Sequence, residues 1–230
     1  MSHKYLPINV SVENRRILVV GGGRIALRKV ENLLNYTAKI TVIAPEPIDA
    51  IIRHASDSKL TLHRRPYRSP EASDYDLAIS ASDDEQVNRT VYDDCLQSGV
   101  MVNVVDNPAL CTFTFPATVR RDCLSLAVST DGKAPFLSAH LRLAVDELFP
   151  EYWGDVARLA AWYRLMVLEK WPHNPEQRMA ALKRFLAFDW QNVLQGKDER
   201  ELDEILVNML DKADRPDAAD DDDDLDRSFS

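Results

Sequence analysis

The residues best suited to chemistry are three consecutive glycines, Gly21, Gly22 and Gly23, with a further small residue at Ala26. They follow Ile17–Val20, an apolar run typical of a buried strand, and they open an amphipathic run typical of a helix. Gly21, Gly23 and Ala26 occupy the three small-residue positions of a dinucleotide fingerprint, in which the helix N-terminus receives a pyrophosphate. Gly21 allows the turn, Gly23 allows close approach of the phosphates, and Ala26 allows close helix packing. Because any tight strand-to-helix turn favours glycine, a purely structural turn remains the alternative.

The residues around this turn alternate between strand and helix patterns, as a parallel α/β sheet requires. We expect the first helix to bury an apolar face made of Ile25, Leu27, Val30, Leu33 and Leu34. Alternation at Leu6, Ile8 and Val10 predicts an additional edge strand. The main strands are expected at 17–20, 40–44, 60–64, 77–81 and 100–105, and the helices between them at 24–35, 48–56 and 86–97.

Beyond residue 108 the pattern changes, which indicates a different layer of structure. Two apolar runs, 113–119 and 124–129, flank a polar turn and predict an antiparallel pair. Helices are expected up to residue 149 and over 152–171, 175–187 and 198–212, with Trp153, Trp162, Trp171 and Trp190 as packing anchors. The predicted class is α/β: a nucleotide-binding parallel-sheet domain (1–112), a small α+β central domain (113–150), a helical domain (151–212) and a disordered acidic tail (213–230).

Three further segments lie where parallel sheets bind ligands, at the carboxyl ends of strands. Pro45 and Glu46 follow the second strand, where an acidic residue accepts hydrogen bonds from the adenosine ribose and favours NAD over NADP; a solvated turn carboxylate is the alternative. Ala81 and Ser82 follow the fourth strand, and their backbone is expected beside the cofactor. Asp106 ends the fifth strand, where a proton-accepting role competes with that of a simple turn residue.

Composition excludes several classes of partner. The net charge is −9, but residues 211–230 hold nine Asp against three Lys or Arg, so the other 210 residues carry only −3. The first 210 residues have no excess of basic side chains that would bind nucleic acid. No apolar segment is long enough to span a membrane. The first residues lack an apolar signal segment, and Cys95, Cys111 and Cys123 form no metal-ligand pair. We therefore expect a cytoplasmic protein whose three thiols are reduced packing residues.

An ordered series of motifs resembles a particular family more specifically than the glycine turn does. The series consists of Tyr5–Ile8, Val19–Gly23 with Ala26, Arg28 and Lys29, Val42–Glu46, Ala81–Asp84 with Val87 and Asn88, Val102–Asp106, Phe115–Ala117, Ala127–Gly132, and Pro135 with Leu137. Together these residues resemble precorrin-2 dehydrogenase / sirohydrochlorin ferrochelatase, the dehydrogenase–chelatase module of siroheme synthase. The likeness runs from about residue 4 to about residue 210.

The resemblance implies a homodimer that oxidises precorrin-2 to sirohydrochlorin with NAD, and in many members also inserts Fe²⁺ to give siroheme. It implies cofactor contacts from Gly21, Gly22, Gly23, Arg24, Ile25, Ala26, Pro45, Glu46, Ala81 and Ser82. The catalytic carboxylate falls on Asp106, and substrate contacts fall on Asn103, Ser129 and Arg142. Whether Asp106 serves as a base or lies on the path of the metal stays open at this point.

The sequence departs from the family pattern just before the central helix. Asp131–Gly132 stands where the family has Gly-Gly, Ala134–Pro135 replaces Ser-Pro, and an expected Arg is missing around Ser138–His140. Lost contacts to a substrate with eight carboxylates would weaken substrate binding or chelation, so dehydrogenation is the stronger expectation. Two alternatives remain: a non-catalytic sensor of NAD or tetrapyrrole, and a chelatase with a vestigial NAD site.

Overall fold

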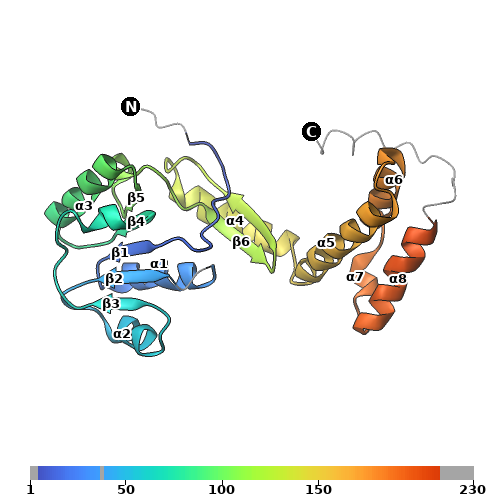
Figure 1. Cartoon of the computed structure of the whole chain (residues 1–230), viewed down its shortest axis with the longest axis horizontal. Coiled ribbons are helices and arrows are strands. Elements are labelled where there is room, and N and C mark those ends of the chain that lie inside the picture. Colours follow the sequence, from blue (N-terminus) through green and yellow to red (C-terminus); the bar gives the residue numbers. More distant parts are fainter. Residues whose placement is uncertain (1–4, 37–38, 213–230) are drawn as a thin grey trace. The chain divides into compact units, whose positions relative to one another are not determined.

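The computed structural model describes residues 5–36 and 39–212, which form two compact units (Figure 1). The first unit contains the chain up to Phe115 together with Ser129–Pro135, and the second contains Pro116–Val128 and the chain from Phe136 onward. The chain therefore passes between the units three times. The predicted boundaries at residues 112 and 150 stay predictions, and the predicted acidic tail, 213–230, lies outside the described residues.

A five-stranded parallel sheet forms the centre of the first unit, in the order β3-β2-β1-β4-β5. Its strands are β1 (Ile17–Val20), β2 (Ile40–Ile43), β3 (Thr61–His63), β4 (Leu77–Ser80) and β5 (Met101–Val104). The order reverses direction beside β1, so β1 and β4 flank a topological switch point. Ligands of open α/β sheets bind at such a point, outside the carboxyl ends of the strands.

Helices cover both faces of this sheet, which explains why β1 is apolar throughout and why every residue of β1 and β4 is buried. Ile17 and Val19 pack with helices α1 (Arg24–Leu34) and α2 (Asp49–Ser56) on one face. Leu18 and Val20 pack with helix α3 (Glu85–Ser98) and a short 3₁₀ turn, η1 (Glu71–Asp74), on the other. All four β1 residues are buried, so the Gly21 turn starts from a rigid strand.

Two predictions for the first unit are wrong. Leu6, Ile8 and Val10 do not form an edge strand; they are exposed and pair with no strand in the described residues. Alternation alone makes a strand only where a neighbour offers free backbone groups. Ile25 was expected in the apolar face of α1, but it is 40% exposed because that face is centred on Ala26, Val30 and Leu33.

The second unit combines a hairpin with helices. Strands β6 (Ala117–Arg121) and β7 (Leu124–Val128) pair antiparallel, as predicted. The helices are α4 (Pro135–Leu148), α5 (Tyr152–Lys170), α6 (Pro175–Leu186), α7 (Trp190–Val193) and α8 (Glu199–Lys212). Residues from α5 to α8 enclose an aromatic core that includes Tyr163, Phe185 and Trp190. The four-residue helix α7 was not predicted, because its sequence is too short to show a period.

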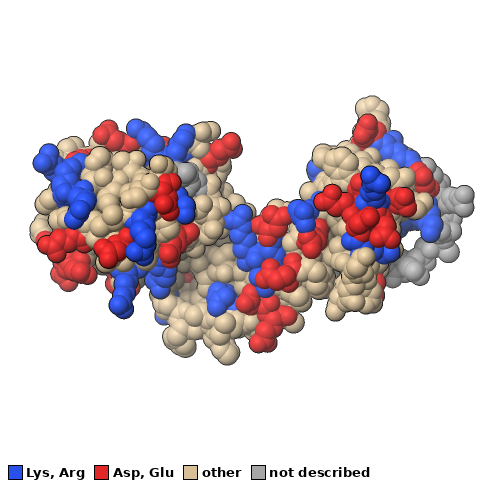
Figure 2. Space-filling view, turned by 90° about the horizontal axis from the view of Figure 1, so that it is seen from below, with Lys and Arg blue, Asp and Glu red and all other residues tan. Residues whose placement is uncertain are grey.

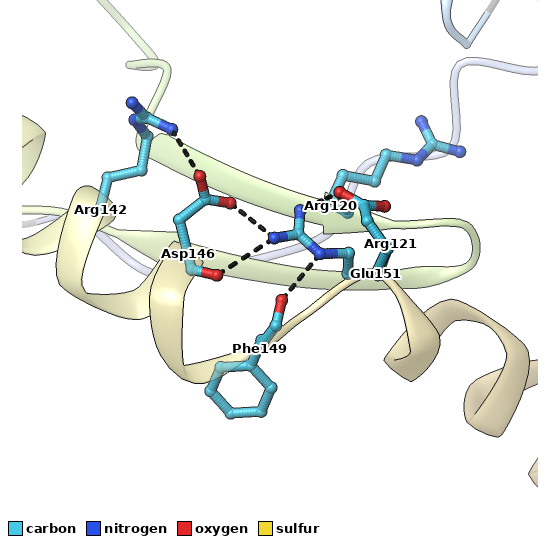
Figure 3. A network of polar contacts seen from close by, with 6 residues as sticks. All are labelled: Arg120, Arg121, Arg142, Asp146, Phe149 and Glu151. Atoms are coloured by element: carbon cyan, nitrogen blue, oxygen red, sulfur yellow. Dashed lines mark hydrogen bonds and ion pairs between the residues drawn. The ribbon is translucent and has the colours of Figure 1, made fainter. Parts of the chain in front are cut away.

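Arg121 joins the hairpin to the end of α4 (Figure 3). Its Nε donates to the Phe149 carbonyl at 2.7 Å, and its Nη2 donates to the Asp146 carboxylate at 2.7 Å and to the Asp146 carbonyl at 3.2 Å. Glu151 lies 3.4 Å from Nη1. Only 10% of the Arg121 side chain is exposed, so its guanidinium is largely shielded from water. The guanidinium thus satisfies carbonyls at the C-terminal end of α4.

Two expected packing residues of the second unit are exposed instead. Trp162 in α5 is 55% exposed, so it does not anchor the helical core, whereas Trp171 and Trp190 do. Cys123 lies in the exposed turn between β6 and β7, so the expectation of three buried thiols is wrong at this position; Cys95 and Cys111 are buried. Tryptophan and cysteine are residue types that favour burial. Trp162 is nevertheless exposed because it lies on the outer side of α5, and Cys123 is exposed because it lies in a turn.

Charged side chains of both signs are mixed over the visible face of each unit (Figure 2). None of the helices in the described ranges combines the length and the apolar character needed to cross a membrane.

Candidate active site

The glycine-rich turn is tightly enclosed at its first two positions. Gly21 has φ +122°, and a Cβ built on it would lie 2.3 Å from the Ala81 carbonyl oxygen. A Cβ on Gly22 would lie 2.7 Å from Cα of Pro47 and 2.8 Å from Cβ of Ala44. The Gly22 carbonyl also accepts a hydrogen bond from the Ile48 N–H at 2.9 Å. Gly21 and Gly22 therefore let the ends of β1, β2 and β4 meet, and the need for Gly22 was not predicted.

Gly23 differs from the other two glycines, because a Cβ built on it would meet nothing within 4 Å. Gly23 is the N-cap of α1, which has no side-chain cap and no acidic residue in its first turn. Helix α3 begins at the same edge of the sheet, but the Asp84 carboxylate accepts from its Gln86 and Val87 N–H groups. The start of α1 thus has open space and uncapped N–H donors, an arrangement that fits the pyrophosphate of a dinucleotide.

The Ala81–Ser82 turn is held by Asn88 from α3, a residue to which no separate role was assigned from sequence. Asn88 Oδ1 accepts from Ser80 Oγ at 2.7 Å and from the Ser82 N–H at 3.3 Å, while Nδ2 donates to the Ser82 carbonyl at 2.9 Å. Ser80 is fully buried. The side-chain amide of Asn88 therefore holds the Ser82 backbone, which is part of the turn predicted to face the cofactor.

Of the remaining predicted cofactor residues, four are accessible and Ala26 is buried. Pro45 and Glu46 are exposed in the corner after β2, and Arg24 and Ile25 are exposed in the first turn of α1. Ala26 is fully buried, in agreement with its expected role in packing α1 against the sheet. Glu46 and Arg24 are therefore accessible side chains of opposite charge.

Asp106 lies two residues beyond β5, in the left-handed region at φ +58°. This conformation is uncommon for residues other than glycine, although Asp and Asn tolerate it. Its side chain is exposed. The carboxylate is therefore an accessible group at the carboxyl edge of the sheet, beyond the outer strand β5 and one strand away from the switch point.

Asn103, a predicted substrate residue, is used inside the fold. It is 8% exposed, and its Nδ2 donates to the Phe113 carbonyl at 3.0 Å and to Cys111 Sγ at 3.5 Å. Cys111 Sγ in turn donates to the Val104 carbonyl at 3.2 Å, and burial raises the pKa of this thiol. These contacts hold the segment after Asp106 against β5, so Asn103 fixes the turn that carries the carboxylate.

Ser129 belongs to the same compact unit as Asp106, although it follows the hairpin in sequence. Its Oγ accepts from the Asp131 N–H at 3.2 Å, and Asp131 is left-handed at φ +52°. Burial raises the pKa of Tyr5, and Cys111 and then Asp131 act in the same direction. The Ser129–Pro135 segment is therefore part of the unit that carries Asp106, and its Asp131 acts on the pKa of Tyr5.

Arg142 belongs to the second unit, where its Nη1 lies 3.9 Å from Asp146 in the network of Figure 3. It is thus paired within α4, one turn from its partner. No group of three or more His, Cys, Asp or Glu side chains in the described ranges could hold a metal ion.

Lys29, in the second turn of α1, was quoted from sequence only as part of the motif series. Its Nζ lies 4.1 Å from the centroid of the Phe115 ring. Its position in the sequence could have identified Lys29 as a residue of interest. An ionisable residue next to the apolar face of a helix lies at the edge of the hydrophobic core, where it is partly buried.

The chain is similar to known proteins both in sequence and in fold. Residues 8–117 match a family model described as "Putative NAD(P)-binding". A siroheme synthase of Pseudoalteromonas translucida is 37% identical over 175 residues, covering 76% of this chain and 37% of that protein. A siroheme synthase of Pseudomonas fluorescens is 37% identical over 212 residues, covering 92% and 43%. Among solved structures, SirC, precorrin-2 dehydrogenase, matches with a TM-score of 0.72 at 22% identity, covering 90% of this chain and 100% of that one.

The chain spans about two fifths of the length of these siroheme synthases. The likeness to SirC confirms the fold, with its parallel sheet followed by helices. Over that part of its relatives the chain is similar to the siroheme synthases, and residues 8–117 are the part that matches the NAD(P)-binding family model.

Proposed function

We propose that this protein oxidises precorrin-2 to sirohydrochlorin with NAD as the hydride acceptor. The observation that carries the proposal is the pairing of two features at one edge of the sheet. The uncapped start of α1 behind Gly23 fits a dinucleotide, and Asp106 stands beyond β5 at the same edge. The names of the relatives, siroheme synthase and precorrin-2 dehydrogenase, supply the substrate class.

The chain's own residues have separate tasks in this reaction. When bound, the nicotinamide supplies the hydride acceptor. The backbone of Gly23 and the first turn of α1 hold the phosphates, and the Ala81–Ser82 turn, fixed by Asn88, borders the cofactor. Asp106 accepts a proton from the macrocycle as the hydride leaves, so that both are removed from the substrate. Glu46 accepts hydrogen bonds from the ribose hydroxyls, which favours NAD over NADP.

A second activity, insertion of Fe²⁺ into sirohydrochlorin, is favoured by the exposure of Asp106. Insertion releases two pyrrole protons, and an accessible carboxylate beside the bound macrocycle is able to take them. Iron is here a substrate rather than a resident metal.

We further propose that the protein is a homodimer and that α4 contributes to the contact. Apolar side chains along this helix are left uncovered within the described chain: Phe136 (79% exposed), Leu137 (41%), Leu141 (41%), Leu143 (52%) and Leu148 (72%). Such a cluster on one helix marks an interaction surface rather than scattered exposure. Sedimentation equilibrium tests this: Leu143→Glu is expected to give monomers, and an unchanged dimer would exclude this face. We also propose a cytoplasmic location, a reducing compartment in which thiols stay unpaired.

The proposed activity is tested by following absorbance during anaerobic incubation with precorrin-2 and NAD, and then with Fe²⁺. A sirohydrochlorin spectrum that requires both protein and NAD supports the dehydrogenase, and a further protein-dependent change with iron supports chelation. NAD binding without turnover would favour a sensor. A change only after addition of iron to supplied sirohydrochlorin would favour a chelatase with a vestigial NAD site.

A further inference from the structure

Lys29 occupies the junction between the nucleotide-binding helix and the segment that follows β5. Its Nζ lies 4.1 Å from the centroid of the Phe115 ring, close enough for a cation–π contact. The charges of Cys111 and Asp106 both act to raise the pKa of the ammonium. The side chain is half-buried, because it flanks the stripe of α1 that packs on the sheet.

This ammonium has no carboxylate partner within the described ranges, since no Asp or Glu oxygen there lies within 4.0 Å of Nζ. Burial lowers the pKa of Lys29, and the neighbouring charge of Arg28 acts in the same direction, whereas Cys111 and Asp106 oppose it. A partly desolvated cation with free N–H donors is unfavourable in isolation, and a bound anion relieves this cost.

The position of Lys29 separates this anion from the phosphates of the dinucleotide. Lys29 lies six residues after Gly23, about 9 Å along the axis of α1. The pyrophosphate belongs at the first turn, where the uncapped N–H groups are. The Lys29 ammonium lies instead over the Phe115 ring, and Asp106 acts on its pKa. The reacting molecule must lie beside Asp106 if Asp106 accepts its proton.

We propose that Lys29 is a substrate-binding residue, whose ammonium receives a carboxylate of the tetrapyrrole beside Asp106. This inference rests on the proposed function, because precorrin-2 brings eight carboxylates to the site. The Phe115 ring holds the ammonium by one face and leaves N–H donors for the substrate. A carboxylate bound at Lys29 places the macrocycle next to Asp106 and selects acidic tetrapyrroles over esterified ones.

Three variants of the full chain test this inference: Lys29→Met, which keeps the length and removes the charge; Lys29→Arg, which keeps both; and Arg28→Met as a matched control. Arg28 is an exposed cation of the same helix turn, and no ion pair holds it in the described ranges. The readouts are kcat and KM for precorrin-2, the Kd of NAD, and the Kd of uroporphyrin, an octacarboxylate porphyrin that serves as an unreactive probe.

Lys29→Met is expected to raise the KM for precorrin-2 and the Kd of uroporphyrin about tenfold, as loss of one charge-assisted contact predicts. The Kd of NAD stays unchanged, which also shows that the variant is folded. Lys29→Arg stays within about threefold of the wild type, and Arg28→Met within about twofold, because an exposed charge contributes little.

Two results would overturn the inference while the proposed function stands. One is a Lys29→Met variant that matches Arg28→Met in both KM and uroporphyrin affinity. The other is a parallel loss of NAD and uroporphyrin binding that Lys29→Arg does not restore, which would assign Lys29 a structural role. If the wild-type protein fails to oxidise precorrin-2, the proposed function fails and this inference with it.

Discussion

Asn88 and Ser82 are joined by two hydrogen bonds: the amide oxygen accepts from the Ser82 N–H at 3.3 Å, and the amide nitrogen donates to the Ser82 carbonyl at 2.9 Å. One side chain from α3 thus fixes both backbone groups of a residue at the switch point of the sheet. The same amide oxygen accepts from the buried Ser80 hydroxyl. This arrangement makes the turn that we propose to border the cofactor a preformed surface rather than a loop that must order on binding.

Asn88→Ala is expected to lower the free energy of unfolding by about 2 kcal/mol, because it leaves the buried Ser80 hydroxyl and the Ser82 backbone without partners. The Kd of NAD rises several-fold, as measured by calorimetry. Gln97→Ala, an exposed amide of the same helix, is the control and changes neither quantity. Equal behaviour of the two variants would show that the turn needs no support from α3.

Two glycine substitutions are expected to have opposite signatures. Gly23→Ala changes the free energy of unfolding by less than about 1 kcal/mol, because its Cβ meets nothing in the protein. The same substitution raises the Kd of NAD at least tenfold, because the Cβ enters the space proposed for the phosphates. Gly21→Ala destabilises the fold by about 3 kcal/mol or more, because its Cβ meets the Ala81 carbonyl and its φ is +122°. Chemical denaturation and NAD titration distinguish them. Unchanged NAD affinity in Gly23→Ala would remove the phosphate assignment.

Asp106→Asn is expected to reduce turnover of precorrin-2 about a hundredfold, the usual contribution of a general base, with no change in the Kd of NAD. Asparagine tolerates the left-handed backbone at this position, so the substitution tests the charge rather than the turn. Asn107→Ala, at the next exposed position, is the control and keeps wild-type turnover. Near-normal turnover in Asp106→Asn would show that this carboxylate is not a general base and that Asp106 serves only to form the turn.

Glu46→Ser is expected to raise the Kd of NAD about tenfold, because it removes the acceptor for the ribose hydroxyls. It is expected to lower the Kd of NADP, because it removes the repulsion of the 2′-phosphate. Arg24 nearby would then favour the phosphate. Glu85→Ser removes an exposed carboxylate from the first turn of α3 and serves as the charge-matched control. If the ratio of NAD to NADP affinity is the same in both variants, Glu46 does not select the cofactor.

Arg121→Met is expected to destabilise the second unit by about 3 kcal/mol, because it leaves the Asp146 carboxylate and two carbonyls at the end of α4 without their donor. Arg142→Met costs less than about 0.5 kcal/mol, since its ion pair is exposed and 3.9 Å long. All four tryptophans lie in this unit, so tryptophan fluorescence reports its unfolding. Equal losses in the two variants would contradict the network of Figure 3.

Local patterns in the sequence were sufficient for most elements of the fold. Ile17–Val20 is apolar on both faces because helices cover both sides of the sheet, and the backbone of Gly21 requires glycine. Asp84 caps α3, a role for which its place directly before the helix is the local signal. These features depend on residues close in sequence, which is why they could be predicted.

Relationships between distant residues could not be predicted in this way. Leu6–Val10 has the alternation of a strand, but no neighbouring strand pairs with it. Asn103 was expected to bind substrate, yet its amide is used to hold Phe113. The contact of Lys29 with Phe115 joins positions 86 residues apart. The sequence by itself therefore determined the strands, the helices and the glycine turn through local periodicity and backbone preference. Tertiary packing determined which polar groups are satisfied within the fold and which, like the Lys29 ammonium, remain for a ligand.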